Sequence, residues 1–257
     1  MKHRKQQGRL YLVGVGPGDP ELMTCKAVQT LERTKVWVVP KAKKNRISSA
    51  RQIASAMVET ANKEILEVRF AMKKIRLEQE PASEARQAWQ DAARIVLDHL
   101  DQGEDVAFPT LGDPGLYSTS FYLLNTLEEM FQKQGRELPV SVIPGITAMS
   151  ACSAQLHAPL SLGDDILTVV PAAFDDERLR DILQTADAVV LMKVFRRLPA
   201  LIELLDDLDL TDKAVLLERC GMEDQHIYTD IRNAADKDLH YFSTLLIRKK
   251  HISTTAS

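Results

Sequence analysis

A polar turn near the middle of the chain carries the residues best suited to bind a ligand or move a proton. Residues 112–119 read Gly-Asp-Pro-Gly-Leu-Tyr-Ser-Thr and follow an apolar segment. Asp113 can accept hydrogen bonds from backbone N–H groups, orient a ligand or act as a general base. Gly112 permits tight curvature, and three hydroxyls follow it, those of Tyr117, Ser118 and Thr119. A ligand-binding turn and an ordinary strand–helix turn both fit this segment, and capping is the simpler role for Asp113.

A second glycine-rich turn, at residues 14–21, reads Gly-Val-Gly-Pro-Gly-Asp-Pro-Glu. Dinucleotide-binding loops have the spacing Gly-x-Gly-x-x-Gly and an acidic residue about 20 residues later. Here the third glycine comes one position early, and residues 35–39 read Lys-Val-Trp-Val-Val where the acid is expected. A strand–turn–helix unit lining another adenosine-containing ligand is therefore favoured over a nicotinamide site.

Two further polar turns follow apolar segments in the second half of the chain. Met192 and Lys193 end the segment 188–193, and residues 219–224 read Arg-Cys-Gly-Met-Glu-Asp after the segment 213–218. Several polar strand ends that converge are typical of a ligand-binding cleft. The residues alone therefore indicate a small-ligand site built from strand ends.

The sequence motifs give little support to nucleophilic catalysis or to metal-dependent chemistry. Neither Gly-x-Ser-x-Gly nor Gly-x-x-x-x-Gly-Lys-[Ser/Thr] occurs, and no patterned base accompanies Ser118 or Thr119. The six histidines have no metal-like spacing, and no Cys-x-x-Cys pair joins Cys25, Cys152 and Cys220. We therefore expect no metal site and no disulfide framework.

The elements that position these turns alternate along the chain. Apolar segments typical of buried strands lie at 10–15, 36–40, 64–70, 106–108 and 140–143, with helical patterns between them. This alternation predicts a parallel sheet with helices on both faces. We expect the helix after the central turn to begin near Leu116.

A second α/β set follows a linker. Strand patterns lie at 166–170, 188–193, 213–218 and 241–247, with helical patterns at 177–185 and 199–208. We expect two domains, residues 1–155 and 156–257, with a ligand cleft between them. The basic tail after Arg248 is expected to be disordered.

Composition favours a cytoplasmic protein without nucleic-acid or membrane partners. The 257 residues carry a net charge of −3, which opposes bulk attraction to nucleic acid. No apolar run approaches the ~20 residues of a membrane span, and no long apolar run follows the basic N-terminus, so we expect no secretory signal. Local basic clusters remain: one is Lys41, Lys43, Lys44 and Arg46, and the other includes Lys73 and Lys74.

The motifs, in this order, resemble those of the tetrapyrrole methylase family over nearly the whole chain. The resemblance rests on residues 13–22, Leu111-Gly-Asp-Pro114, Val142-Ile-Pro-Gly-Ile146 and the second α/β half. Residues 112–119, Val190-Leu-Met-Lys193, Gly221-Met-Glu-Asp224 and Tyr241-Phe-Ser243 are similar to the subfamily that methylates C-20 of precorrin-2 or its cobalt complex.

This resemblance implies a homodimer of two α/β domains, an N-terminal one with a mostly parallel sheet and a C-terminal one with a mixed sheet. It implies S-adenosylmethionine as the methyl donor, bound in a cleft between the domains, and a tetrapyrrole acceptor in cobalamin biosynthesis. The implied donor contacts are Pro17, Gly112, Asp113, Tyr117, Ser118, Thr119, Met192, Lys193, Cys220 and Gly221. Tyr117 and Asp113 are weak candidates for a base.

Carboxylates of the acceptor would meet a basic set, with Lys41, Lys43, Lys44, Arg46, Lys193 and Arg196 as its main members, joined by Lys73, Lys74 and Arg197. Three alternatives stay open. They are a family member that methylates another position or acceptor, a nicotinamide-dependent oxidoreductase, and a non-catalytic S-adenosylmethionine-binding module.

Overall fold

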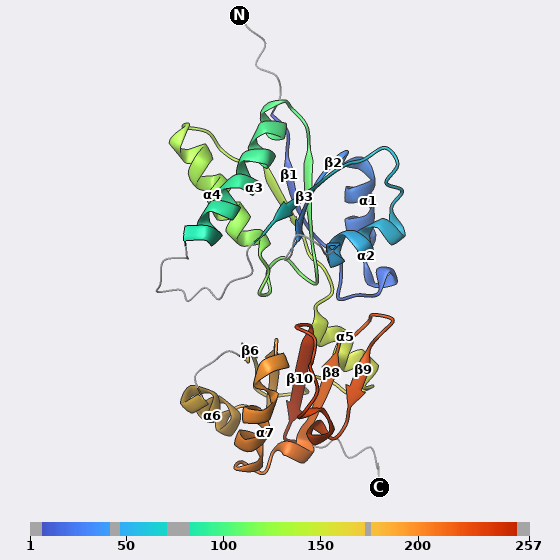
Figure 1. Ribbon diagram of the computed structural model, residues 1–257, viewed down its shortest axis with the longest axis vertical. Coiled ribbons are helices and arrows are strands. Elements are labelled where there is room, and N and C mark those ends of the chain that lie inside the picture. The colour runs from blue at the N-terminus through green and yellow to red at the C-terminus, as the bar shows by residue number, and fades with distance from the viewer. Residues whose placement is uncertain (1–6, 42–46, 71–82, 173–175, 251–257) are drawn as a thin grey trace, which may run out of the picture. The chain divides into compact units, whose positions relative to one another are not determined.

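The structure, a computed structural model, describes residues 7–41, 47–70, 83–172 and 176–250 (Figure 1). The chain divides into two compact units, Met1–Thr147 and Ala148–Ser257. Helix α5, Ala148–Gln155, is grouped with the second unit, whereas the sequence analysis placed it in the first domain. It packs against a strand of the second sheet, a contact that local sequence patterns do not reveal.

A five-stranded parallel sheet forms the centre of the first unit, as predicted. The strands lie in the order β3-β2-β4-β1-β5, and every pair in that order is parallel. Because all five strands run the same way, their carboxyl ends lie at one edge of the sheet. Their bounds are β1 Leu10–Gly14, β2 Val36–Lys41, β3 Glu64–Arg69, β4 Val106–Thr110 and β5 Val140–Ile143.

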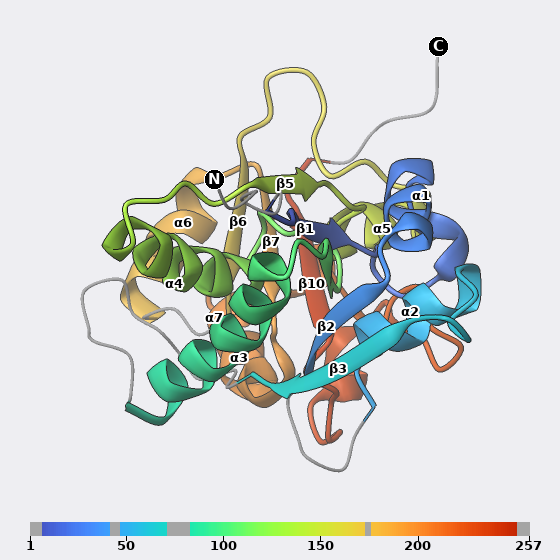
Figure 2. The same cartoon turned by 90° about the horizontal axis from the view of Figure 1, so that it is seen from above.

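Helices cover both faces of this sheet (Figures 1 and 2). Alternate residues of β1 serve the two faces: Leu10 and Leu12 pack in a core with α3 and α4, and Tyr11 and Val13 pack in a core with α1 and α2. This period of two follows from the pleat of a strand. The helices are α1 Cys25–Arg33, α2 Ser49–Met57, α3 Ser83–Asp101 and α4 Ser120–Lys133, with a 3₁₀ turn at Pro20–Leu22.

The predicted start of the fourth helix was wrong. Helix α4 begins at Ser120, four residues after the expected start at Leu116. Tyr117 has a φ of 49°, in the left-handed region, so a right-handed helix cannot pass through it. The intervening residues instead belong to the central turn.

The second unit contains a mixed five-stranded sheet in the order β6-β7-β10-β8-β9. Strands β6 and β7 are parallel, and the other pairs are antiparallel. Strand β9, His226–Tyr228, was not predicted from the sequence, and it is short and mostly exposed. The other bounds are β6 Leu167–Pro171, β7 Ala188–Met192, β8 Ala214–Glu218, β10 Ser243–Arg248, α6 Asp176–Thr185 and α7 Leu198–Asp206. Short 3₁₀ turns lie at Phe195–Arg197, Thr211–Lys213 and Ile231–Ala234.

The first two residues of the tail after β10, Lys249 and Lys250, are held by a hydrogen bond and ion pairs, contrary to the expectation of disorder, whereas residues 251–257 lie outside the described part of the chain. The Asp165 carboxylate contacts Arg248 at 3.1 Å and Lys250 at 3.0 Å. Its Oδ2 also accepts a hydrogen bond from the Leu162 N–H, at 3.0 Å. Lys249 donates from its backbone to the Asp187 carbonyl, at 3.1 Å. These contacts tie the loop before β6 to the end of β10.

Asp165→Asn is expected to lower the Tm at pH 7 and to weaken the acid dependence of stability. The Leu162 N–H and then the Lys250 ammonium hold the pKa of Asp165 below its usual value. A depressed folded pKa contributes stability above the unfolded value of about 3.9 and loses it as the pH falls through the folded pKa. Thermal melts from pH 7 to pH 2 test this. The exposed neighbour provides the control Asp164→Asn, and equal melting curves for both variants would contradict the role of Asp165.

Candidate functional site

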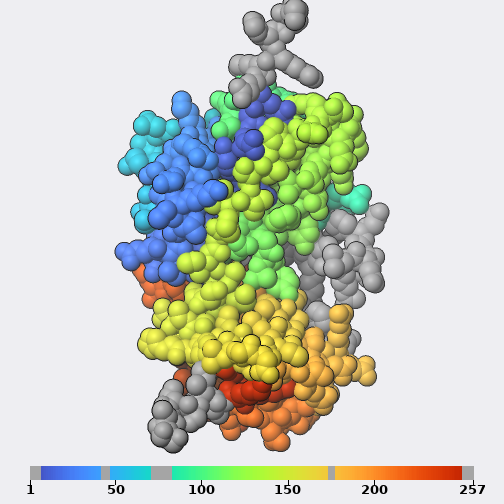
Figure 3. Space-filling model, turned by 180° about the vertical axis from the view of Figure 1, so that it is seen from behind, coloured from blue at the N-terminus to red at the C-terminus, as the bar shows by residue number. Residues whose placement is uncertain are grey.

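Three loops meet at the carboxyl edge of the first sheet, after β1, β4 and β5. The strand order places β1 between β4 and β5. Gly16 and Gly112 exchange backbone hydrogen bonds, with Gly16 N donating at 3.3 Å and Gly112 N donating at 2.7 Å. Strand β5 is an edge strand, and its segment lies on the surface between α1 and α4 (Figure 3). The loop after β5 therefore joins the other two from the edge of the sheet.

Glycines allow these loop backbones to approach each other closely. A Cβ on Gly145 would lie 2.2 Å from the Gly112 carbonyl oxygen and 2.9 Å from Gly14 Cα. A Cβ on Gly14 would lie 2.7 Å from both the Gly112 oxygen and the Gly145 nitrogen. These contacts are shorter than any real Cβ makes, so only glycine fits at both positions.

Asp113 ties two of the loops together. Its Oδ1 accepts a hydrogen bond from the Gly115 N–H at 2.7 Å, and its Oδ2 accepts one from the Gly145 N–H at 2.9 Å. Both carboxylate oxygens thus hold backbone groups, one within its own turn and one in the loop after β5. This geometry suits an organiser of the site better than a general base.

The hydroxyl-bearing residues of the central turn differ in their surroundings. Ser118 Oγ lies 2.9 Å from both Thr110 Oγ1 and Ser120 Oγ, so it stabilises the turn itself. Tyr117 is 42% exposed. Partial burial raises the pKa of Tyr117 above its usual value, so its phenol stays protonated at neutral pH and suits a hydrogen-bond donor better than a base. Thr119 is half-buried at the start of α4, and Pro17 is buried in the first loop.

Two turns flank the start of β10 at one edge of the second sheet. Lys193, directly after β7, has a φ of 63°, and Arg219, directly after β8, has a φ of 52°. Lys193 N donates to the Ser243 carbonyl at 2.9 Å, and Arg219 N donates to the Phe242 carbonyl at 2.7 Å. The first residue of β10 and the residue before it thus support the two left-handed residues. Met192, Lys193, Cys220 and Gly221, predicted from separate motifs, come to this edge.

Cys220 contacts a second cysteine from helix α5. The Cys152 thiol donates a hydrogen bond to the Cys220 sulfur, which raises the pKa of Cys152 and lowers that of Cys220. Both side chains are buried, and neither forms a disulfide. Gly221 N donates to Gln225 Oε1 at 2.7 Å, which fixes the turn after Cys220. Cys220 therefore presents mainly its backbone at this turn.

The predicted basic residues have varied surroundings. Lys41 pairs with Glu67 at 3.0 Å, and Glu67 also pairs with Arg51 at 2.9 Å, so part of the Lys41 charge is balanced. Lys193 lies with its ammonium 5.5 Å from the Tyr241 ring centroid, and the exposed Arg196 lies over Phe195. Five predicted residues lie outside the described part of the chain: Lys43, Lys44, Arg46, Lys73 and Lys74. Arg197, which completes the set, is half-buried in the 3₁₀ turn before α7.

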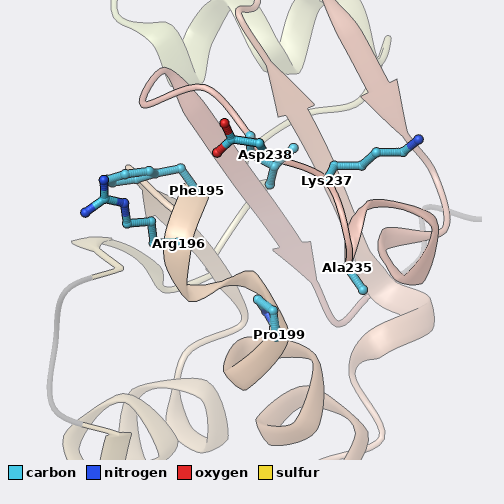
Figure 4. A pocket seen from close by; sticks show the side chains of 7 residues that line it. Phe195, Arg196, Pro199, Ala235, Lys237 and Asp238 are labelled. Carbon is cyan, nitrogen blue, oxygen red and sulfur yellow. The ribbon is translucent and has the colours of Figure 1, made fainter.

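A cavity of about 200 Å³ in the second unit lies beside this turn (Figure 4). The side chains of Arg196 and Lys237 extend away from each other in the view. The cavity therefore does not bring two cations to one anion. Its lining consists of Phe195, Arg196, Pro199, Ala235, Lys237, Asp238 and Leu239.

Sequence reasoning missed the roles of Gly145, Tyr241 and Ser243. Gly145 was noted only as part of the family motif Val142-Ile-Pro-Gly-Ile146, and the other two only as part of a subfamily motif. Within the described ranges, no three or more His, Cys, Asp or Glu residues are grouped to hold a metal. No described helix is both long enough and apolar enough to cross a membrane.

The fold and the site define a class: a two-unit α/β protein with glycine-rich turns at the carboxyl ends of its strands. The family model for Tetrapyrrole (Corrin/Porphyrin) Methylases matches residues 9–235. The chain therefore belongs to the tetrapyrrole methylase family.

Individual relatives span almost the entire chain. It is 34% identical to a precorrin-2 C(20)-methyltransferase of Sinorhizobium sp., over 93% of this chain and 95% of the relative. It is 28% identical to the cobalt-precorrin-2 C(20)-methyltransferase of Salmonella typhimurium, over 95% of this chain and 97% of the relative. The crystal structure of the methyltransferase CobJ has the same fold, with a TM-score of 0.67 at 20% identity over 94% of each chain. The Thermus thermophilus uroporphyrin-III C-methyltransferase bound to S-adenosylhomocysteine has a TM-score of 0.64 at 20% identity, over 93% of this chain and 97% of the other.

Proposed function

We propose that the protein transfers a methyl group from S-adenosylmethionine to C-20 of precorrin-2 or its cobalt complex, in cobalamin biosynthesis. The observation that carries this proposal is the match at 34% identity, over almost the full length of both chains, to a relative of that name. We propose further that the protein acts in the cytoplasm and that it forms a homodimer. Light scattering on the purified protein tests the homodimer.

The donor is proposed to contact turns of both units. In the first unit the contacts are Pro17, Gly112, Asp113, Tyr117, Ser118 and Thr119, and in the second they are Met192, Lys193, Cys220 and Gly221. Gly112 and Gly221 carry no Cβ, so a ligand can approach the backbone of their turns closely. The hydrogen bonds of Asp113 hold the central turn in shape and tie it to the loop after β5.

S-Adenosylmethionine supplies a sulfonium-bound methyl that is already a strong electrophile. The protein's task is therefore to position the acceptor carbon in line with that methyl, and positioning alone can lower a barrier by roughly 7–11 kcal/mol in favourable cases. Asp113 acts as an organiser in this proposal, and protonated Tyr117 as a hydrogen-bond donor. The acceptor's carboxylates would bind basic side chains, among them Lys193 and Arg196.

Incubation with S-adenosylmethionine and a panel of tetrapyrroles, followed by mass spectrometry, tests this function. A gain of one methyl group on precorrin-2 or on its cobalt complex is the expected result, and product NMR would place it at C-20. Methylation of another acceptor or position would favour a different member of the family. Donor binding without methylation of any tetrapyrrole would indicate a binding module instead.

A further inference from the structure

The turn after β8, residues 219–225, has a backbone that needs support. Arg219 and Gly221 have φ values of 52° and 78°, both in the left-handed region. This region is unfavourable for a residue with a side chain, such as Arg219. Two backbone hydrogen bonds close the turn: Met222 N donates to the Arg219 carbonyl at 3.0 Å, and Gln225 N donates to the Met222 carbonyl at 3.1 Å. Neither of these bonds involves Gly221.

The side chain of Gln225 supports the turn at Gly221. Its Oε1 accepts a hydrogen bond from Gly221 N at 2.7 Å, and its Nε2 donates to Gln155 Oε1 at 3.3 Å. Chemistry fixes the orientation of this amide, because a backbone N–H needs an acceptor and only the amide oxygen can accept. Gln225 is half-buried, and Gln155 is the last residue of helix α5. The amide of Gln225 therefore joins the turn to that helix.

Helix α5 contacts the same turn at a second residue. Cys152 lies three positions before Gln155, so the two side chains share one face of the helix. The Cys152 thiol donates a hydrogen bond to the Cys220 sulfur, and its own sulfur accepts one from the Thr244 hydroxyl on β10. Cys152, Cys220 and Thr244 are all buried. Side-chain contacts thus hold two consecutive residues of the turn, Cys220 and Gly221.

We propose that Gln225 is a positioning residue for the methyl donor, which holds the turn after β8 in the conformation that binds S-adenosylmethionine. The inference rests on the proposed function, because it takes Cys220 and Gly221 to be donor contacts. Gln225 acts through Gly221: its oxygen keeps the backbone of the turn in one arrangement. Without this bond the turn populates other conformations, and the apparent donor affinity falls with the fraction that can bind.

Calorimetric titration of three Gln225 variants with S-adenosylhomocysteine tests the proposal. Gln225→Glu retains an acceptor for the Gly221 N–H and should keep the Kd within about twofold of the wild type. Gln225→Met removes the acceptor at nearly constant length, and Gln225→Asn is one methylene too short to reach Gly221. Both should raise the Kd about 2- to 12-fold, the range of one hydrogen bond. The KM for the tetrapyrrole should stay within about twofold.

A matched control lies on helix α5 itself, where Ser153 Oγ donates to the Ala158 carbonyl at 2.6 Å. Ser153→Ala also removes a bond between a side chain and the backbone, and it should lower the Tm without changing the Kd. The proposal is overturned if Gln225→Asn binds S-adenosylhomocysteine as tightly as the wild type, or if Gln225→Glu binds it as weakly as Gln225→Asn. Both comparisons hold even if Gln225→Met does not fold. Wild-type protein that binds no S-adenosylhomocysteine would instead reject the proposed function.

Discussion

Gly145→Ala is expected to abolish most methyl transfer and to weaken donor binding. The new methyl would lie 2.2 Å from the Gly112 carbonyl oxygen, with backbone atoms of Gly14 also within 3 Å. These neighbours are main chain, so no side chain can rotate to relieve the overlap. The three loops must separate, which costs about 1–3 kcal/mol of folding free energy. A displacement near 1 Å at a reacting centre also lowers the rate by about 10²-fold. Calorimetric titration with S-adenosylhomocysteine and steady-state kinetics measure the two effects.

Gly8→Ala provides a matched control for Gly145→Ala. A Cβ on Gly8 would lie 1.9 Å from the Glu104 carbonyl oxygen, an equally severe overlap with backbone. Gly8 precedes β1 and lies at the opposite end of that strand from the three loops. We expect this variant to lose stability, and its folded fraction to bind S-adenosylhomocysteine normally. Unchanged donor affinity in Gly145→Ala would show that the loop contact does not shape the donor site.

Asp113→Ala should reduce kcat/KM by about 10²-fold or more, chiefly through weaker donor binding. The substitution removes the two hydrogen bonds to Gly115 N and Gly145 N. Hydrogen bonds to a charged group contribute about 1.5–3 kcal/mol each. Loss of the bond to Gly145 releases the loop after β5 from the central turn, and loss of the bond to Gly115 loosens that turn. Binding of S-adenosylhomocysteine and single-turnover rates separate loss of donor affinity from loss of chemistry.

Asp113→Asn distinguishes an organiser from a base. The amide retains one acceptor oxygen but turns an NH₂ group toward the other N–H, so it should weaken donor binding less than alanine does. A base would behave differently, because asparagine and alanine would then lower the single-turnover rate equally and leave the affinity for S-adenosylhomocysteine intact. That second pattern would indicate that Asp113 acts as a general base.

Local sequence patterns predicted most of the fold. Alternation of apolar segments indicated the parallel sheet of the first unit, and β1 confirms it, with Leu12 and Val13 packed on opposite faces. Two misses have local causes that periodicity does not detect. Strand β9 is short and mostly exposed, and the start of α4 is delayed by the left-handed Tyr117.

The candidate site was predicted only in part, because its motifs are local and its contacts are not. The Gly-Asp-Pro turn was identified, yet the partner of Asp113 in the loop after β5 was not, since 32 residues separate Asp113 from Gly145. Lys41 was predicted to bind substrate, and the structure adds its ion pair with Glu67 on the neighbouring strand. Such pairings depend on which strands are neighbours in the sheet, and the spacing of residues in the sequence does not predict that order.

By itself the sequence determined the element types, the two α/β sets and the motifs of the tetrapyrrole methylase family. These properties depend on side-chain periodicity and on residues with restricted backbone angles, which act over a few neighbours. Only the tertiary structure decided that Gly14, Gly112 and Gly145 touch, and that Ser243 and Tyr241 hold Lys193. These contacts arise because strands distant in the chain lie side by side in the sheets and bring their ends together.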